Sequence, residues 1–418
     1  MQQLEQAFVV GGMVMILWLH PLLELIKAKH IISVNNYPSS IYFKEKQMRR
    51  LLYLTLVAVG LPIASWSQEL NPAINTPDKF AWETFVSINK PVTPGGNTAT
   101  WESWINEEDV YADPNHIPTW PAQQLLAQQL VKRLKPITQL RIQKEEVATH
   151  NKRLHIGETK TLLVAPLQGG AEEVRMNKST FGFIVENKLW YIEGQVDAFY
   201  SYQKTGKTIS FPTGSKEIKA IWKPITEEQK PRFHWASNSS ENNKTYGLVA
   251  IHIISKDLPN WIWATFEQID NPERCKILGC NDGFGTTESG NLSPELTKMF
   301  ADAGLGPEWK YYRLDGTQTN FTDAQGRPTL LGNSVTEDGF VPTSSCITCH
   351  ARSTIGPPVT GETGANRLSV FDPTNPNQSN NGTPDPKWYY KDPKDRSTVK
   401  YVQLDFLWSL QNANHRTQ

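Results

Sequence analysis

The stretch YGLVAIHIIS, residues 246–255, limits the possible folds of this chain more than any other segment, because both of its alternating faces are apolar. A strand of this kind has to be covered on both sides, so we expect it at the centre of a sandwich or a covered sheet. Other short runs, rich in β-branched and aromatic residues, surround it from about residue 160 to 270. We therefore predict strands, mostly antiparallel because their connections are short, at 161–167, 180–194, 208–214, 217–225, 246–255 and 261–270.

Three further segments predict helices beside these strands. Residues 80–91, FAWETFVSINKP, place apolar side chains near helical spacing and end at a proline. Residues 118–134 carry leucines on one side and basic residues in the last turn, and residues 293–304 begin with a serine cap and close on a glycine. The expected fold is α+β, a mainly antiparallel, sandwich-like β scaffold with flanking helices.

The first 67 residues indicate targeting. The segment that begins at Met48, MRRLLYLTLVAVGLPIASWSQEL, combines two arginines, an apolar stretch and small residues, which are the three parts of a secretory signal peptide at 48–67. Residues 1–47 are then an upstream extension of the reading frame or, alternatively, a membrane segment weakened by glycines and polar residues. We expect an exported, periplasmic bacterial protein that is attached to a membrane only if residues 1–67 are retained.

Composition divides the rest of the chain into three parts and excludes one class of partner. We predict a helical N-terminal part at 68–150, a β-rich core at 151–290 and a C-terminal part at 291–418, which contains a loop-rich stretch followed by an ordered end. Basic and acidic residues number 42 each. Because this balance creates no strong field of one sign, we expect no nucleic acid as a partner.

Cys346, Cys349 and His350 form the pattern Cys-x-x-Cys-His within SSCITCHARST. This pattern is the attachment signature of c-type haem. Two thiols three positions apart reach the two vinyl groups on one edge of the porphyrin, and the histidine that follows is held beneath the iron as its proximal ligand. We therefore predict one covalent haem c in the C-terminal part. Such attachment takes place outside the bacterial cytoplasm, in agreement with the export signal.

Two other interpretations of the motif stay open. A zinc site could join Cys346 and Cys349 to the second cysteine pair, Cys275 and Cys280. A redox dithiol would need the motif at a strand end within a βαβ unit, which the surrounding sequence does not show. In an exported protein, Cys275 and Cys280 are most simply a local disulfide.

The second axial ligand of the iron is not defined by the sequence. No methionine follows residue 350, so the distal candidates are Met299 and His252, with His116, His150, His155, His234 and His415 as further histidines. Met299 lies in a predicted helix, where filling a core is the alternative role. His252 lies in the apolar strand, where a hydrogen-bonded core histidine is the alternative. Three arginines are candidates for pairing with haem propionates: Arg313, Arg352 and Arg367.

The sixth position decides between two functions. A filled position favours one-electron transfer with periplasmic redox partner proteins, whereas an open one admits peroxide, nitric oxide or carbon monoxide and favours a haem enzyme or a small-ligand sensor. Whether the protein is an enzyme stays open on this evidence.

Several segments together resemble a large group of bacterial exported proteins known as cytochrome c family proteins. The likeness spans roughly residues 80–410 and is carried by EIKAIWKPI, YGLVAIHIISKDLPNWIWATFEQIDN, YYRLDGTQ, LGNSV, SSCITCH and LDFLWSL. The resemblance implies haem attachment at Cys346 and Cys349, axial ligation by His350 and a histidine at the place of His252. It also implies electron transfer, without a defined substrate.

Overall fold

The computed structural model describes residues 71–121, 170–238, 244–338, 340–358, 365–368, 381–395 and 397–417. These residues belong to one compact unit that begins at Leu70. The predicted signal peptide, the upstream extension, the strand at 161–167 and most of the helix at 118–134 lie outside the described residues, as do His150 and His155. Within the described ranges, no helix is both long and apolar enough to cross a lipid bilayer.

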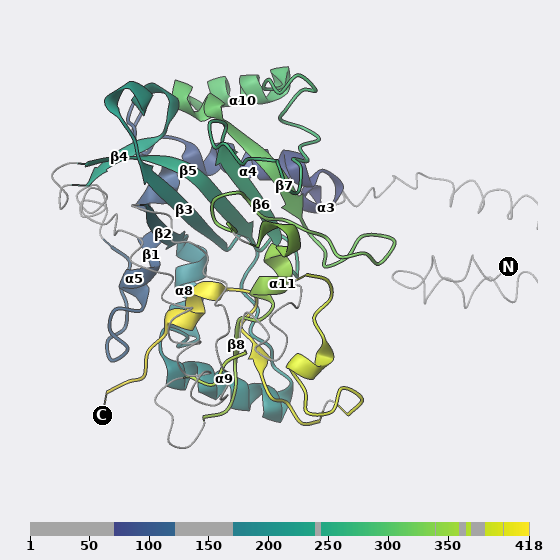
Figure 1. The fold of residues 1–418 in the computed structure, drawn as a ribbon. Coiled ribbons are helices and arrows are strands. Elements are labelled where there is room, and N and C mark those ends of the chain that lie inside the picture. Colours follow the sequence, from purple (N-terminus) through teal and green to yellow (C-terminus); the bar gives the residue numbers. More distant parts are fainter. Residues whose placement is uncertain are drawn as a thin grey trace, which may run out of the picture. The chain divides into compact units, whose positions relative to one another are not determined.

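A seven-stranded antiparallel sheet organises the unit (Figure 1). Its path is β1-β2-β3-β5-β6-β7, with β4 paired beside β5, so β5 lies between β3 and β6 as its apolar sequence predicts. Together with the helices, this sheet confirms the α+β class. The strands are β1 (Ile105–Asn106), β2 (Ala171–Met176), β3 (Lys216–Pro224), β4 (Trp235–Asn238), β5 (Lys244–Ser255), β6 (Ile262–Gln268) and β7 (Tyr312–Gln318).

Helices cover one face of this sheet. Helix α4 (Pro77–Asn89) and helix α10 (Pro294–Ala303) confirm two of the predicted helices, and α10 has the expected Ser293 cap and a left-handed Gly304 after its last turn. Trp82 and Phe85 of α4 pack edge-on and tilted against Phe266 of β6, and Phe300 of α10 stacks on Phe85, so the sheet buries an aromatic core here. Helix α3 (Pro72–Asn75) precedes α4.

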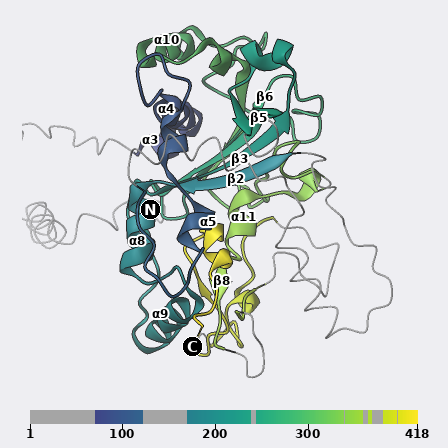
Figure 2. The ribbon, with the colours of Figure 1, turned by 90° about the vertical axis from the view of Figure 1, so that its left-hand side faces the viewer.

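The opposite face of the sheet packs on the remaining elements, as the turned view in Figure 2 shows for α4 and α11. These elements are α5 (Glu107–Val110), α8 (Lys178–Glu186), α9 (Ile192–Thr205), α11 (Cys346–His350) and the small sheet of β8 (Thr354–Ile355) with β9 (Val402–Gln403). The C-terminal residues pack back on the body, since Leu404, Leu407 and Leu410 are fully buried. A second large sheet, which a sandwich requires, is not found among the described residues.

Two predicted strands are wrong. Residues 180–194 form parts of α8 and α9, because Asn177 accepts a hydrogen bond from the backbone of Thr180 at the helix start and the buried Phe181 and Ile184 lie three positions apart. Their β-branched and aromatic content suggested a strand, but the cap and the spacing favour a helix. Residues 208–214 form no strand, and the backbone N–H of Phe211 donates to the carboxylate of Asp405, 2.6 Å away, instead of to a neighbouring strand.

Candidate functional site

The Cys-x-x-Cys-His motif forms one helical turn, α11, which is fixed to the end of strand β7. Gln318 makes this connection: its Oε1 accepts a hydrogen bond from the backbone N–H of Ile347 at 3.0 Å, and its Nε2 donates to Ser345 Oγ at 2.8 Å. Cys346 and Ile347 are buried in the core that the C-terminal residues complete. The helical turn brings the two cysteines and the histidine to one place.

His350 has a defined orientation and protonation. Its Nδ1 lies 2.8 Å from the backbone carbonyl oxygen of Phe406, and a carbonyl only accepts, so Nδ1 carries the proton and donates. Nε2 is then left with its lone pair, the form that binds a metal. Burial lowers the pKa of His350 to about 4, which keeps the ring neutral. Trp263 packs against the imidazole with ring centroids 4.5 Å apart.

The two motif cysteines are thiols with little tendency to ionise. Burial raises the pKa of Cys346 well above its ordinary value and that of Cys349 to about 11, and the nearby Glu337 raises both further. A redox dithiol has the opposite property, because its attacking cysteine needs a lowered pKa. Within the part of the chain that the structure describes, the strands pair antiparallel and form no βαβ unit. The environment therefore favours uncharged sulfur, as in a thiol or a thioether, over a thiolate.

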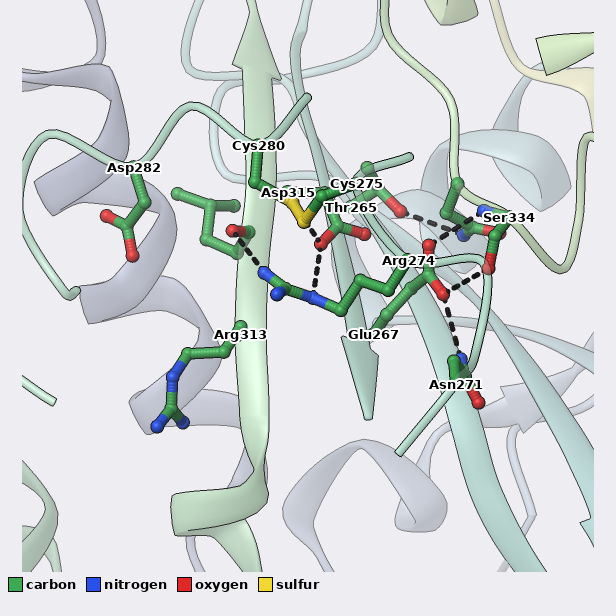
Figure 3. Close-up of polar contacts among 12 residues, drawn as sticks. Thr265, Glu267, Asn271, Arg274, Cys275, Cys280, Asp282, Arg313, Asp315 and Ser334 are labelled. Carbon is green, nitrogen blue, oxygen red and sulfur yellow. Dashed lines mark hydrogen bonds and ion pairs between the residues drawn. A yellow bond between two sulfur atoms is a disulfide. The ribbon is translucent and has the colours of Figure 1, made fainter. Parts of the chain in front are cut away.

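Cys275 and Cys280 form a disulfide, as predicted (Figure 3). Asp315 lies within 4.8 Å of both sulfurs and forms an ion pair with Arg274, whose Nε is 2.8 Å from Asp315 Oδ1. Because the two sulfurs are bonded to each other, they offer no thiolates, and the four-cysteine zinc interpretation does not fit this arrangement.

His252 lies on the same sheet face as Trp263 and therefore on the face that carries α11. It pairs in register with Thr265 of β6, two residues along from Trp263. Its Nε2 lies 2.7 Å from Asn333 Nδ2 and 3.0 Å from Thr336 Oγ1. Burial, followed by the charges of Lys219 and His350, lowers the pKa of His252 to about 3. The structure thus brings His252 and His350 into one polar region.

Lys219 is a cation beside His252 in this polar region. It pairs in register with His252, and its Nζ lies 3.0 Å from Glu172 Oε2. Burial raises the pKa of Glu337 to about 7, and Lys219 partly opposes that increase. The sheet face under the motif therefore carries charged groups of both signs.

The other candidate ligands lie elsewhere. Met299 packs against the aromatic core on the opposite face of the sheet. His234 is buried there too and stacks on Trp309 with centroids 4.6 Å apart. His116 and His415 are exposed and pair with Asp113 and Glu193. Of the histidines that the structure describes, only His252 and His350 share the sheet face beneath α11.

The three arginines differ in their relation to the motif. Arg352 is buried two residues after His350, with its guanidinium 4.0 Å from the ring centre of Trp388. Arg367 donates to the backbone carbonyl of Thr354 and to Gln195. Arg313 donates to the backbone carbonyls of Gly290 and Lys310, on the side of β7 shown in Figure 3. Arg352 is thus the arginine nearest to the motif along the chain.

Three site features lie outside the Cys-x-x-Cys-His motif and were not predicted as site residues. The Phe406 carbonyl that orients His350 belongs to the backbone, which every residue has. Asn333 lies 81 positions from His252 in the sequence. The two partners of the ion pair, Lys256 and Asp405, lie 149 positions apart. The segment LGNSV, part of the family resemblance, is the one signal that pointed toward Asn333.

Comparison of the chain with protein-family models, curated proteins and solved structures finds no match. The functional argument therefore depends on the geometry of the motif and of its surroundings.

Proposed function

We propose that this protein is an exported monohaem c-type cytochrome, with its haem attached to Cys346 and Cys349 and ligated by His350. The hydrogen bond from His350 Nδ1 to the Phe406 carbonyl carries the proposal, because it holds the imidazole with Nε2 ready for iron. The loop-rich C-terminal part, 291–418, supplies the motif, the carbonyl and the buried residues around them.

The residues present fit the group. Both cysteines are held as neutral thiols on one helical turn, and a thioether sulfur would also be uncharged, so the buried surroundings would suit the attached state as well. When bound, the haem iron supplies a one-electron couple between its ferric and ferrous states. Gln318 and the Phe406 carbonyl anchor the ends of the motif, and this rigid support favours electron transfer with periplasmic redox partner proteins.

One observation favours a second function, that of a haem enzyme or a small-ligand sensor with an open sixth position. The lone pair of His252 Nε2 faces the amide of Asn333, and Met299 packs on the opposite face of the sheet. Neither distal candidate therefore offers the iron a free lone pair in this arrangement. Peroxide, nitric oxide and carbon monoxide are the small ligands that such a site would admit.

The test is an absorption spectrum of the protein matured in a host that attaches haem c. We expect a c-type spectrum whose haem stays with the chain under denaturing conditions. Cys349→Ala should lose covalent haem or fail to mature, whereas the Cys275→Ser/Cys280→Ser protein, which lacks the other pair, should keep it. Covalent haem in Cys349→Ala, or bound zinc without haem in the unmodified protein, would contradict the proposal.

Reduction in the presence of carbon monoxide separates the two functions. A spectrum that ignores carbon monoxide indicates two tight axial ligands and an electron carrier, and one that shifts promptly indicates an accessible iron. Sequencing the N-terminus of the native protein tests export: a chain that begins after Ser67 supports it, and retention of Met1 contradicts it.

A further inference from the structure

The side-chain amide of Asn333 has a fixed orientation. Its Oδ1 accepts hydrogen bonds from the backbone N–H groups of Val335 and Thr336, at 2.9 and 2.6 Å. Its Nδ2 donates to Thr265 Oγ1 at 2.9 Å. An exchanged amide would turn its NH₂ group against two N–H donors, so the oxygen and the nitrogen can be assigned.

The orientation of Asn333 determines which nitrogen of His252 carries the proton. Asn333 Nδ2 is a donor 2.7 Å from His252 Nε2, and two N–H groups repel each other at that distance. His252 Nε2 therefore accepts, and the proton lies on Nδ1. Thr336 Oγ1, 3.0 Å from the same nitrogen, can donate to it as well.

The loop that holds His252 is itself tied to the sheet. The backbone N–H and the hydroxyl of Ser334 donate to the two carboxylate oxygens of Glu267, at 2.7 and 2.6 Å, and Figure 3 shows both bonds. The backbone N–H of Asn333 donates to Glu337 Oε2 at 2.7 Å. Releasing Nε2 from Asn333 would disturb this whole set of hydrogen bonds.

The Nδ1–H group of His252 is not used by any described residue. The side chain keeps 12% of its surface exposed, and its polar contacts with described residues are all made at Nε2. On the sheet face it lies beside Thr265, next to the Trp263 that packs on His350. The Nδ1–H group of His252 therefore lies on the side of the ring away from Asn333, in the region that contains the proposed haem ligand His350.

We propose that His252 is not an axial ligand but a hydrogen-bond donor, through Nδ1–H, to a small anion or oxygen-bearing ligand that binds in the haem pocket. This inference rests on the proposed function, because it takes His350 as the haem ligand. Asn333, whose amide is oriented by the backbone N–H groups of Val335 and Thr336, fixes the tautomer of His252 that donates through Nδ1. A ligand with an electron-rich terminal atom, such as fluoride, hydroxide or peroxide, matches that donor, whereas carbon monoxide is a poor acceptor.

The experiment compares fluoride affinity of the ferric protein with carbon monoxide affinity of the ferrous protein in the unmodified chain, in His252→Phe and in His252→Gln. Loss of one hydrogen bond should weaken fluoride binding about tenfold in His252→Phe. Carbon monoxide binding should change less than threefold by the same argument. His252→Gln, which can still donate, should recover part of the fluoride affinity.

The possible failures are distinguishable. One outcome would overturn the inference by identifying His252 as the axial ligand. In that case the unmodified protein is low-spin and does not bind carbon monoxide, and the iron binds carbon monoxide only in His252→Phe. Equal fluoride affinity in all three proteins would leave His252 a structural role alone. Absence of covalent haem from the unmodified protein would instead refute the proposed function.

A measurement on the unmodified chain keeps the inference testable if the variants do not fold. Nitrogen NMR of a histidine-labelled protein without haem distinguishes the two tautomers of a neutral imidazole. We expect the His252 proton on Nδ1, and a proton on Nε2 would overturn the assignment.

Discussion

Asp405 and Phe406 both have left-handed backbone conformations, with φ of +48° and +67°. For residues other than glycine, each such conformation costs about 1–3 kcal/mol and persists only where the surroundings enforce it. Here Asp405 accepts hydrogen bonds from Lys256 Nζ and from the backbone of Phe211, both at 2.6 Å. The turn they hold presents the Phe406 carbonyl to His350, so the ion pair contributes to the orientation of the His350 ring.

Replacing Lys256 tests this arrangement. The side chains of Lys256 and Asp405 are only 8% and 7% exposed, so Lys256→Met leaves a buried carboxylate without its cation. We expect a loss of about 3–5 kcal/mol in the free energy of unfolding, measured by denaturant titration.

The matched control is Lys298→Met, which removes the cation of an exposed pair. Lys298 and Asp302 are 74% and 63% exposed, so the change should stay below about 1 kcal/mol. Equal effects of the two substitutions would show that burial of the Lys256 pair does not decide its contribution.

Individual site residues differ in how far the sequence could predict them. Cys346, Cys349 and His350 are a local pattern with a fixed spacing, and the structure places them on one turn of helix. His252 was a candidate by residue type alone, and its role depends on Asn333, which a loop brings to it from 81 positions away. Sequence spacing contains no information on such a contact, and none on which nitrogen carries the proton.

Strand β3 carries a buried carboxyl group that makes stability depend on pH. Burial raises the pKa of Glu217 to about 7, and Ser409 Oγ donates to it at 2.5 Å. Since the folded pKa lies above the ordinary value of 4.5, the folded state binds more protons than the unfolded one between these values. The contribution of Glu217 is therefore fully present below about pH 4.5 and is lost as pH rises through 7.

Glu217→Gln should remove this loss, because glutamine stays neutral and its oxygen can still accept from Ser409. We expect the variant to exceed the unmodified protein in free energy of unfolding at pH 8 by on the order of 2 kcal/mol, and to show little difference at pH 5. Denaturant titrations at both values measure it. The exposed Glu288→Gln is the control, and a pH-independent effect of Glu217→Gln would contradict the assignment.

The disulfide closes a short loop between β6 and α10. Its cysteines are five positions apart, so the Cys275→Ser/Cys280→Ser protein should lose about 2 kcal/mol of stability by the loop-entropy relation. Thermal unfolding with and without a reductant checks this value. No loss in the variant would show that the Arg274–Asp315 ion pair and its neighbours already fix the loop.

A helix or strand can be predicted where the residue pattern within its own segment is sufficient to identify it. Strands β3, β5 and β6 and helices α4 and α10 follow from periodicity and caps. Strand β2 was missed because its buried Glu173 and Arg175 read as exposed, although they pair with each other at 2.8 Å. The cap at Asn177 favours a helix, whereas the β-branched and aromatic content of residues 180–194 favours a strand across what is the body of α8 and the start of α9.

The arrangement of the whole unit depends on contacts between distant segments. The C-terminal residues after β9 contact both early and central parts: Asn412 Nδ2 donates to Glu107 at 3.0 Å, and Ser409 donates to Glu217 on β3. The order β1-β2-β3-β5-β6-β7 could not be read from periodicity, because alternation identifies a strand but not its neighbours.

The hydrogen bond between His350 and Phe406 joins residues 56 positions apart, and this separation has a meaning during biosynthesis. At about 5–20 residues per second, a ribosome makes the motif roughly 3–11 s before it makes the carbonyl that orients the histidine. Through that interval the nascent chain contains both thiols but not the segment that later encloses them. The order of translation thus opens a time window in which the cysteines stay reachable, and synthesis of the segment around Phe406 closes it.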